Sequence, residues 1–236
     1  HRDLHLSIRR QRQMCIRDRV DDSGRTDDRL TFPDEVVAGK IIAVLPDVPA
    51  ADLMAPVEAM IQEKVRVFAL PVADAERRRA VLRIYRRRAV VGVHGVMTIE
   101  DVQGLVDDKV SFALPVAANR EVLDALRQAG IPAAPDALTP NEVRAAWGAG
   151  ADAVQVAPAD MGSASYGDIL TRMAPGAALI PRGGVGSYAL RRWLAAGALA
   201  VCLDDVLVGD ACEDGIVSAL RERCRSVLQV VADADA

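Results

Sequence analysis

From Gly39 onward the chain alternates short apolar runs with amphipathic stretches in a regular rhythm. The apolar runs are rich in β-branched residues, which is typical of parallel strands that are buried on both faces. The predicted strands are Lys40–Leu45, Arg66–Leu70, Ala89–Val93, Val110–Leu114, Ile131–Ala134, Ala153–Ala157, Ala178–Ile180 and Ala200–Leu203.

Each apolar run is followed by a stretch with helical periodicity. The predicted helices are Pro49–Glu63, Asp74–Arg87, Thr98–Asp107, Asn119–Gln128, Pro140–Trp147, Gly167–Arg172, Ser187–Ala196 and a long last helix near Glu213–Val231. Two of them begin with the spacing of a capping box, Thr98 before Asp101 and Thr139 before Glu142. The strand and helix boundaries therefore agree with each other along the whole segment.

Eight strand–helix units in about 200 residues predict an α/β fold, a single (β/α)8 TIM barrel. A doubly wound open sheet is the alternative, but no GxGxxG motif follows the first predicted strand. Residues 66–83 and 110–127 also share the run FALPVA at the same phase, two units apart. Such a repeat favours a barrel built from paired strand–helix modules.

The first 29 residues differ from the rest of the chain. They lack sustained periodicity and contain a dense cluster of arginines. A basic arm for nucleic acid or an acidic partner and a plain disordered extension are two interpretations; the run SIRRQRQMCIRDR also resembles a translated sequencing adaptor. We therefore expect residues 1–29 to be a non-native or disordered leader and residues 30–236 to form the barrel.

Composition narrows the class of protein. The 29 basic and 33 acidic side chains give a formal net charge of −4, which argues against a strongly basic nucleic-acid binder. No stretch approaches the roughly 20 apolar residues of a membrane span, so we expect no membrane partner. The cysteines form no CxxC pair and no Cys/His metal spacing, and a reduced, cytoplasmic location is expected.

In a barrel of this kind, chemistry takes place at the C-terminal ends of the strands. His94 ends the third predicted strand and is a candidate general base or metal ligand. Asp136 follows the fifth strand, and Asp204 and Asp205 follow the eighth, so a divalent metal held by these side chains is one possibility. A structural histidine and a solvated acidic loop are the alternatives.

The run RGGVG at Arg182–Gly186 follows the seventh strand and precedes a helix. Free backbone N–H groups at Gly183 and Gly184, beside the Arg182 charge, are typical of an anion cradle. Glycines that only permit a tight turn are the alternative.

From Gly39 to Asp210 the sequence resembles the 2-keto-3-deoxy-6-phosphogluconate (KDPG)/4-hydroxy-2-oxoglutarate (KHG) aldolases. The resemblance rests on IIAVLPDVPAADLMAPVEAMIQEKVRVFAL, AVVGVHGVMTIEDV, SFALPVAANREVLDALRQAGIPAAPDALTPNEV, VQVAPAD and PRGGVG, in this order. It implies a compact barrel, a homotrimer, and cleavage of a 2-oxo acid or sugar acid through a lysine Schiff base. Pro158, in the VQVAPAD block, and the strand-seven glycines would lie at the substrate.

The resemblance fails at the catalytic residues. The position of the family's Schiff-base lysine is Gln155, and an amide cannot form an imine. The chain has only three lysines. Lys40 and Lys109 precede their predicted strands and Lys64 ends a predicted helix, so we expect all three on the opposite rim of the barrel.

Other positions of the family's site have changed as well. The family's strand-two glutamate corresponds to Ala69, its nearby arginine to Ala73, and the threonine after strand three to Gly95. Its Gly-Gly-Ser phosphate contact after strand eight corresponds to Leu203, Asp204 and Asp205, and two carboxylates would repel a phosphate.

Two hypotheses remain. The first is a diverged carbon–carbon lyase of carbohydrate metabolism with no cofactor, or with a divalent metal at Asp204 and Asp205. His94, Asp136 and Gln155 would carry its chemistry, and Arg182, Gly183, Gly184 and Pro158 would bind the substrate. The second hypothesis is a non-catalytic barrel, a pseudoenzyme that binds a ligand or has a structural role.

Overall fold

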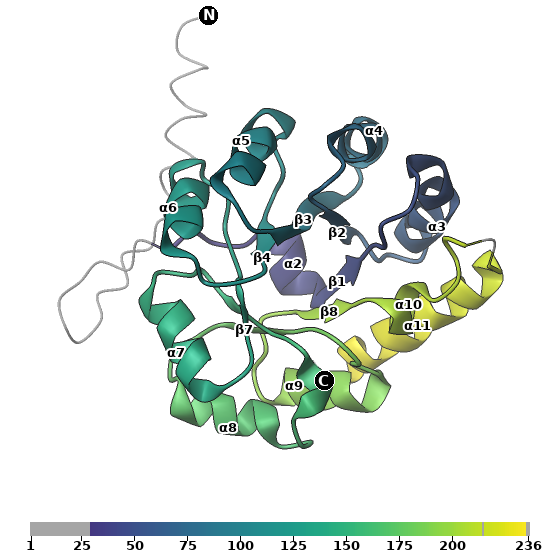
Figure 1. Cartoon of the computed structure of the whole chain (residues 1–236). Coiled ribbons are helices and arrows are strands. Elements are labelled where there is room, and N and C mark those ends of the chain that lie inside the picture. Colours follow the sequence, from purple (N-terminus) through teal and green to yellow (C-terminus); the bar gives the residue numbers. More distant parts are fainter. Residues whose placement is uncertain (1–28, 214, 235–236) are drawn as a thin grey trace, which may run out of the picture.

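Eight short parallel strands form a closed ring in the computed structural model, which describes residues 29–213 and 215–234 (Figure 1). The strands are β1 (Ile41–Val44), β2 (Val67–Pro71), β3 (Val90–Val96), β4 (Ala113–Pro115), β5 (Asp136–Ala137), β6 (Val154–Val156), β7 (Leu179–Pro181) and β8 (Val201–Leu203). They pair in the orders β4-β3-β2-β1-β8 and β5-β6-β7. Single bridges between Ala113 and Ala133 and between Arg182 and Cys202 join the two sheets. The predicted (β/α)8 barrel is confirmed.

A ring of helices surrounds the strands in chain order (Figure 1). The helices are α2 (Asp34–Gly39), α3 (Ala50–Gln62), α4 (Ala75–Tyr85), α5 (Ile99–Asp108), α6 (Arg120–Gln128), α7 (Pro140–Gly148), α8 (Tyr166–Met173), α9 (Ser187–Ala195), α10 (Asp205–Val208) and α11 (Val217–Ala234), with a 3-10 turn at Ala159–Met161. Both predicted capping boxes are present, at Thr98 with Asp101 and at Thr139 with Glu142. None of the described helices is both long and apolar enough to cross a membrane.

The fifth strand is where the sequence prediction was wrong. The predicted strand Ile131–Ala134 forms an isolated bridge, between Ala133 and Ala113, and no regular ladder, and β5 is Asp136–Ala137. Pro132 and Pro135 interrupt this segment, and proline has no N–H group to donate to a ladder. The shift matters for the site, because it makes Asp136 part of the strand.

The inside of the barrel is a packed core. Thirteen buried residues form this cluster, which contains Ile42, Val44, Val67, Ala69, Phe112, Leu114, Ala134, Ala153, Ile180, Ala200 and Cys202 together with Phe32 and Val36. The last two come from the segment that contains α2, a helix that the periodicity did not predict. The Phe32 and Phe112 rings lie 5.9 Å apart, so this segment closes the N-terminal end of the barrel.

The repeated run FALPVA has opposite orientations in its two copies. In β2, Val67 and Ala69 face the barrel interior, whereas Phe68 and Leu70 belong to the layer between strands and helices. In the second copy, Phe112 directly precedes β4 and faces the interior. A shift of one residue turns every side chain of a strand to the other face. The two copies are therefore not equivalent in three dimensions.

The described structure begins at Arg29, the last residue of the expected leader. Its guanidinium donates to the carbonyl oxygens of Ala151 and Trp147, at 3.0 Å and 2.8 Å, and lies 3.6 Å from the centre of the Trp147 ring. Arg29 thus packs on the barrel. Residues 1–28 lie outside the described residues, and the expectation about them stays a prediction.

The three lysines occupy turns that lead into strands. Lys40, Lys64 and Lys109 have φ angles of 59°, 76° and 55°, the left-handed conformation that glycine adopts most easily. Lys40 directly precedes β1, Lys64 lies in the connection between α3 and β2, and Lys109 lies in the connection between α5 and β4. All three therefore lie at the N-terminal end of the barrel.

Candidate functional site

Side-chain alternation along the strands brings five of the predicted site residues to one end of the barrel. The interior residues occupy every second position, so the next positions toward the C-terminal end also point inward. These positions are His94 in β3, Asp136 in β5, Gln155 in β6, and Arg182 and Asp204, which directly follow β7 and β8. We call these five residues the mouth cluster.

Arg182 is the charge that links the mouth cluster. Its side chain is 24% exposed, and its Nε lies 3.9 Å from Oδ2 of Asp204. The positive charge lowers the pKa values of both His94 and Asp136, although burial is the largest influence on each. A guanidinium in this position presents planar donors that match a carboxylate.

Asp136 and Gln155 form a hydrogen bond beside Arg182. The Nε2 amide of Gln155 donates to Oδ1 of Asp136. Burial raises the pKa of the Asp136 carboxyl to about 6, against the opposing effects of the Gln155 hydrogen bond and the Arg182 charge. The Gln155 side chain is fully buried, and its Oε1 has no hydrogen-bond partner among the described residues. Asp136 is therefore poised to exchange a proton near neutral pH.

His94 is held as a neutral ring. Burial, reinforced by the Arg182 charge, lowers its pKa to about 4. Its Nε2 lies 3.1 Å from the carbonyl oxygen of Leu45, so the neutral tautomer that donates there leaves Nδ1 as an acceptor. The strand bulges directly after His94, at Gly95, whose φ of +83° favours glycine.

Arg77 was missed by the sequence analysis. It lies on α4, is 4% exposed, and donates to Oδ1 of Asp47 at 2.5 Å and to the Val48 carbonyl at 2.9 Å. Its charge also lowers the pKa of His94, behind the stronger effects of burial and Arg182. The only signal in the sequence is its position three residues after Asp74, whose side chain caps α4 by accepting from the Arg77 N–H.

The glycines after β7 have a clear backbone role. Gly183 and Gly184 have φ angles of 92° and 63°, which disfavour any other residue. A Cβ on Gly183 would meet Pro158 at 3.4 Å, and a Cβ on Gly184 would overlap the Asp160 side chain. Because the Asp160 carboxylate lies beside Gly184, it competes with any anion for this turn.

The chain's own carboxylates offer no complete metal site. Within residues 29–213 and 215–234, no group of three or more His, Cys, Asp or Glu side chains could hold a metal ion. Asp204 lies near Arg182, while Asp205 is exposed at the start of α10. The predicted metal stays a prediction, and no step is derived through it.

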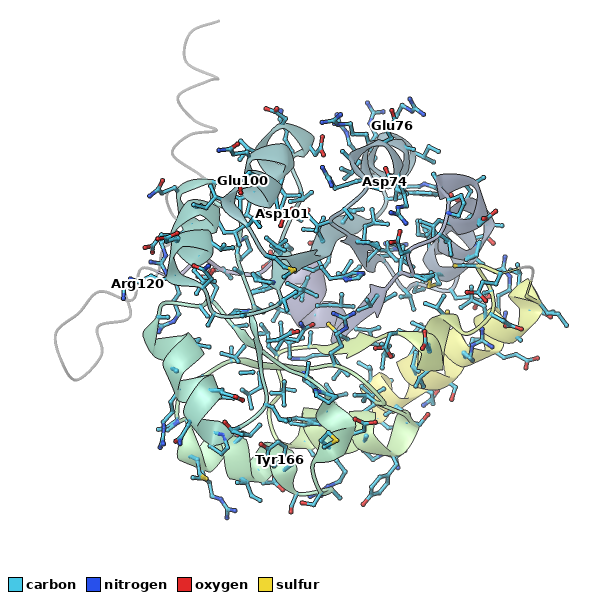
Figure 2. All side chains as sticks on the ribbon, viewed as in Figure 1. Asp74, Glu76, Glu100, Asp101, Arg120 and Tyr166 are labelled. Carbon is cyan, nitrogen blue, oxygen red and sulfur yellow. The ribbon has the colours of Figure 1, made fainter. Side chains whose placement is uncertain are left out.

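Acidic side chains also mark the helices that begin at this end of the barrel. Figure 2 shows Asp74 and Glu76 on α4 and Glu100 and Asp101 on the neighbouring α5. All four belong to the cap or first turn of their helix, where negative charge stabilises the helix dipole. These carboxylates have a structural role, which distinguishes them from the partly buried mouth cluster.

A family model described as KDPG and KHG aldolase matches residues 34–215 of the chain. No curated protein matches its sequence. Solved structures do match its fold. The native KDPGal structure has a TM-score of 0.75 and 22% identity, over 83% of this chain and 95% of that one.

A second structure is the Legionella pneumophila KDPG aldolase with pyruvate captured as a covalent carbinolamine. Its TM-score is 0.70 at 20% identity, covering 80% of this chain and 93% of that one. The 3-hexulose-6-phosphate synthase of Salmonella typhimurium has a TM-score of 0.67 at 16% identity, covering 83% of this chain and 99% of that one. At such identities the structural likeness establishes the barrel fold, which proteins with different reactions share.

Proposed function

The chain belongs to the KDPG and KHG aldolase family, and on that basis we propose that it is a carbon–carbon lyase that cleaves a small 2-oxo acid or sugar acid without a Schiff base. The observation that carries the proposal is Arg182, a partly buried guanidinium next to Asp136, whose pKa is raised to about 6. One group suits a substrate carboxylate or enolate, and the other suits proton transfer.

The lysine route lacks its nucleophile at this mouth. A carbinolamine such as that of the Legionella protein requires an amine, and the amide nitrogen of Gln155 is not nucleophilic. The lysines lie at the other end of the barrel. From Lys40 to Val44, the last residue of β1, the strand rises by about 13 Å, which is more than a lysine side chain spans.

Acid–base cleavage needs only the groups that are present. In the proposed reaction, the Asp136 carboxylate accepts the proton of the C4 hydroxyl. The C3–C4 bond breaks, an aldehyde leaves, and the electron pair forms the enolate of pyruvate, whose oxygen Arg182 stabilises. Asp136 then returns the proton to C3. His94 remains neutral and accepts or donates hydrogen bonds without adding charge.

A binding protein without catalysis is the second candidate. The observation that favours it is Gln155, a fully buried amide bonded to the proposed base, Asp136. That hydrogen bond ties up one carboxylate oxygen and lowers the pKa of Asp136. Such a mouth would bind an oxo acid through Arg182 and release it unchanged.

Pyruvate release and calorimetry separate the two candidates. The lyase releases pyruvate from KDPG or KHG, loses this activity on Asp136→Asn and Arg182→Ala, and keeps it in Arg191→Ala, an exposed arginine on α9. Heat of binding with no pyruvate release favours the binding protein, and neither heat nor product contradicts both. Chelation should leave the activity unchanged; its loss would instead implicate a metal at Asp204 and Asp205.

We include a cytoplasmic location, a role in carbohydrate metabolism and a homotrimer in the same proposal. The buried free thiols of Cys202, Cys212 and Cys224 suit a reducing compartment. Exposed apolar side chains, among them Met161 at 72% and Tyr188 at 66%, suit burial against another copy. Analytical ultracentrifugation tests the trimer, and a monomer at all concentrations would contradict it.

A further inference from the structure

A group of arginines lies at the N-terminal end of the barrel, far from the mouth cluster. Arg86, Arg87 and Arg88 follow α4, and Arg66 directly precedes β2. Together with Glu35, Ala89, Val90 and Ser111 they line a cavity of about 420 Å³. We call Arg66, Arg83, Arg86 and Arg87, which are all exposed, the rim cluster.

A second cavity adjoins the first. It has a volume of about 600 Å³, lies between α4 and α5, and is lined by Arg79, Leu82, Arg83, Ile84, Arg86, Arg87, Asp107 and Asp108. Arg86 and Arg87 line both cavities. The two hollows therefore share a wall made of guanidinium groups.

The rim cluster is distinguished by its lack of partners. Arg88 pairs with Glu58 at 2.7 Å and Arg79 with Asp108 at 2.8 Å. The side chains of Arg66, Arg83, Arg86 and Arg87 make no hydrogen bond and no ion pair within the described part of the chain. All four are exposed, so their donors are available to a ligand.

Helix electrostatics explain only part of this arrangement. A cation in the last turn of a helix interacts well with the helix dipole, and Arg83 has that position on α4. Arg66 belongs to a different segment, and Arg86 and Arg87 follow one another on a chain with a net charge of −4. Like charges placed this close repel each other unless an anion lies between them.

We infer that the rim cluster binds a free oligophosphate, a small molecule with two or more linked phosphate groups. Guanidinium groups bind phosphate oxygens through paired hydrogen bonds. The shared wall of Arg86 and Arg87 allows one phosphate group to lie in each hollow. Glu35, Asp107 and Asp108 in the lining interrupt the positive surface, which favours a compact ligand over a long nucleic acid.

Calorimetric titration of the full chain with inorganic tripolyphosphate at low salt tests the inference. Because residues 1–28 carry arginines of their own, the readout is the difference between variants. The Arg86→Ala/Arg87→Ala double variant should bind about a hundredfold more weakly and Arg66→Ala about tenfold more weakly, and added salt should weaken binding further. Arg172→Ala and Arg191→Ala, which remove exposed arginines elsewhere, should match the wild type.

Three results would overturn the inference. The first is that tripolyphosphate does not bind, and the second is that it binds equally to all variants. The third is that a single-stranded RNA oligonucleotide binds while tripolyphosphate does not, and that the rim variants lose this RNA binding. A second measurement keeps the test independent of variant folding. Tripolyphosphate should protect Arg86 and Arg87 of the wild type from phenylglyoxal, as mapped by mass spectrometry, and unprotected arginines there would contradict the site.

Discussion

Arg182 and Arg77 at the C-terminal mouth each lie beside an aspartate, whereas Arg66, Arg83, Arg86 and Arg87 at the N-terminal rim have no such partner among the described residues. The mouth is partly buried, and burial shifts the pKa values of His94 and Asp136 in opposite senses. The rim is exposed, and its guanidinium groups face water. Burial therefore provides the mouth with groups that can exchange protons. The exposed rim has cations that can attract an anion.

The same contrast divides the arginines of α4. Arg78 is buried and pairs with Asp108 at 2.6 Å, with side-chain exposures of 3% and 4%. Arg83 belongs to the rim cluster and is exposed on the same helix. Two arginines of one helix thus differ only in where the helix presents them. Their different roles make the comparison testable.

The largest expected effect is the loss of the buried partner. Asp108→Ala leaves the Arg78 guanidinium buried without its carboxylate and should lower the free energy of unfolding by about 3 to 5 kcal/mol, measured by urea denaturation. Asp107→Ala, its exposed neighbour, should change stability by less than about 0.5 kcal/mol. Equal effects of the two variants would contradict the assigned burial.

A double variant sharpens this result. Arg78→Met with Asp108→Leu replaces both buried charges with apolar groups, so most of the lost stability should return. A double variant as unstable as Asp108→Ala would mean that the loss comes from packing and not from the unpaired charge.

Opposite pKa shifts at the mouth give the next largest effect. The pKa of Asp136 is raised from 3.8 to about 6, so the folded state binds the extra proton and this group's contribution to stability falls as pH rises through that window. The pKa of His94 is lowered from 6.5 to about 4, so the unfolded state binds the extra proton and stability falls as pH drops from 6.5 to 4. The two contributions oppose each other.

Removing either group should reveal the pH dependence of stability that the other group contributes. Asp136→Asn should stabilise the protein at pH 7 by about 1 to 2 kcal/mol after allowing for solvent screening, and its loss of stability below pH 6.5 should be steeper than in the wild type. His94→Gln should change the slope in the other direction. Unfolding curves across this pH range measure both, and parallel profiles in all three proteins would rule out the assigned shifts.

The smallest expected effect concerns the lysines. Lys64 has a φ of 76°, so Lys64→Gly should relieve backbone strain, partly offset by the freer unfolded chain, and raise stability by about 0.5 kcal/mol. Lys64→Ala keeps the strain and should give no gain. Neither variant should alter pyruvate release; a loss of activity in both would contradict the assignment of this lysine to a turn.

The barrel was predictable because short apolar runs, helical periodicity and capping boxes agree along the chain. Strand five was misplaced because Ile131–Ala134 looks apolar enough for a strand, while Pro132 within it and Pro135 after it prevent a continuous ladder. The helix α2 has six residues, too few for periodicity to show. The repeat FALPVA misled in a different way, since identical residues in β2 and β4 face opposite sides.

The sequence predicted which residues lie at the site, but it did not predict the pKa shifts of their side chains. Strand ends gave His94, Asp136, Gln155, Arg182 and Asp204, because alternation fixes which residues point inward. The pKa shifts depend on burial and on the Arg182 charge, which no local pattern encodes. For the same reason, the sequence cannot separate buried Arg77 and Arg78 from the exposed arginines beside them.

Borohydride reduction in the presence of pyruvate, followed by intact-mass measurement, tests the central claim that the mouth works without a Schiff base. A family member that forms a carbinolamine, treated in parallel, provides the positive control. The account predicts that this chain keeps its mass while the control gains one reduced pyruvate. A stable adduct on Lys40, Lys64 or Lys109 would contradict it.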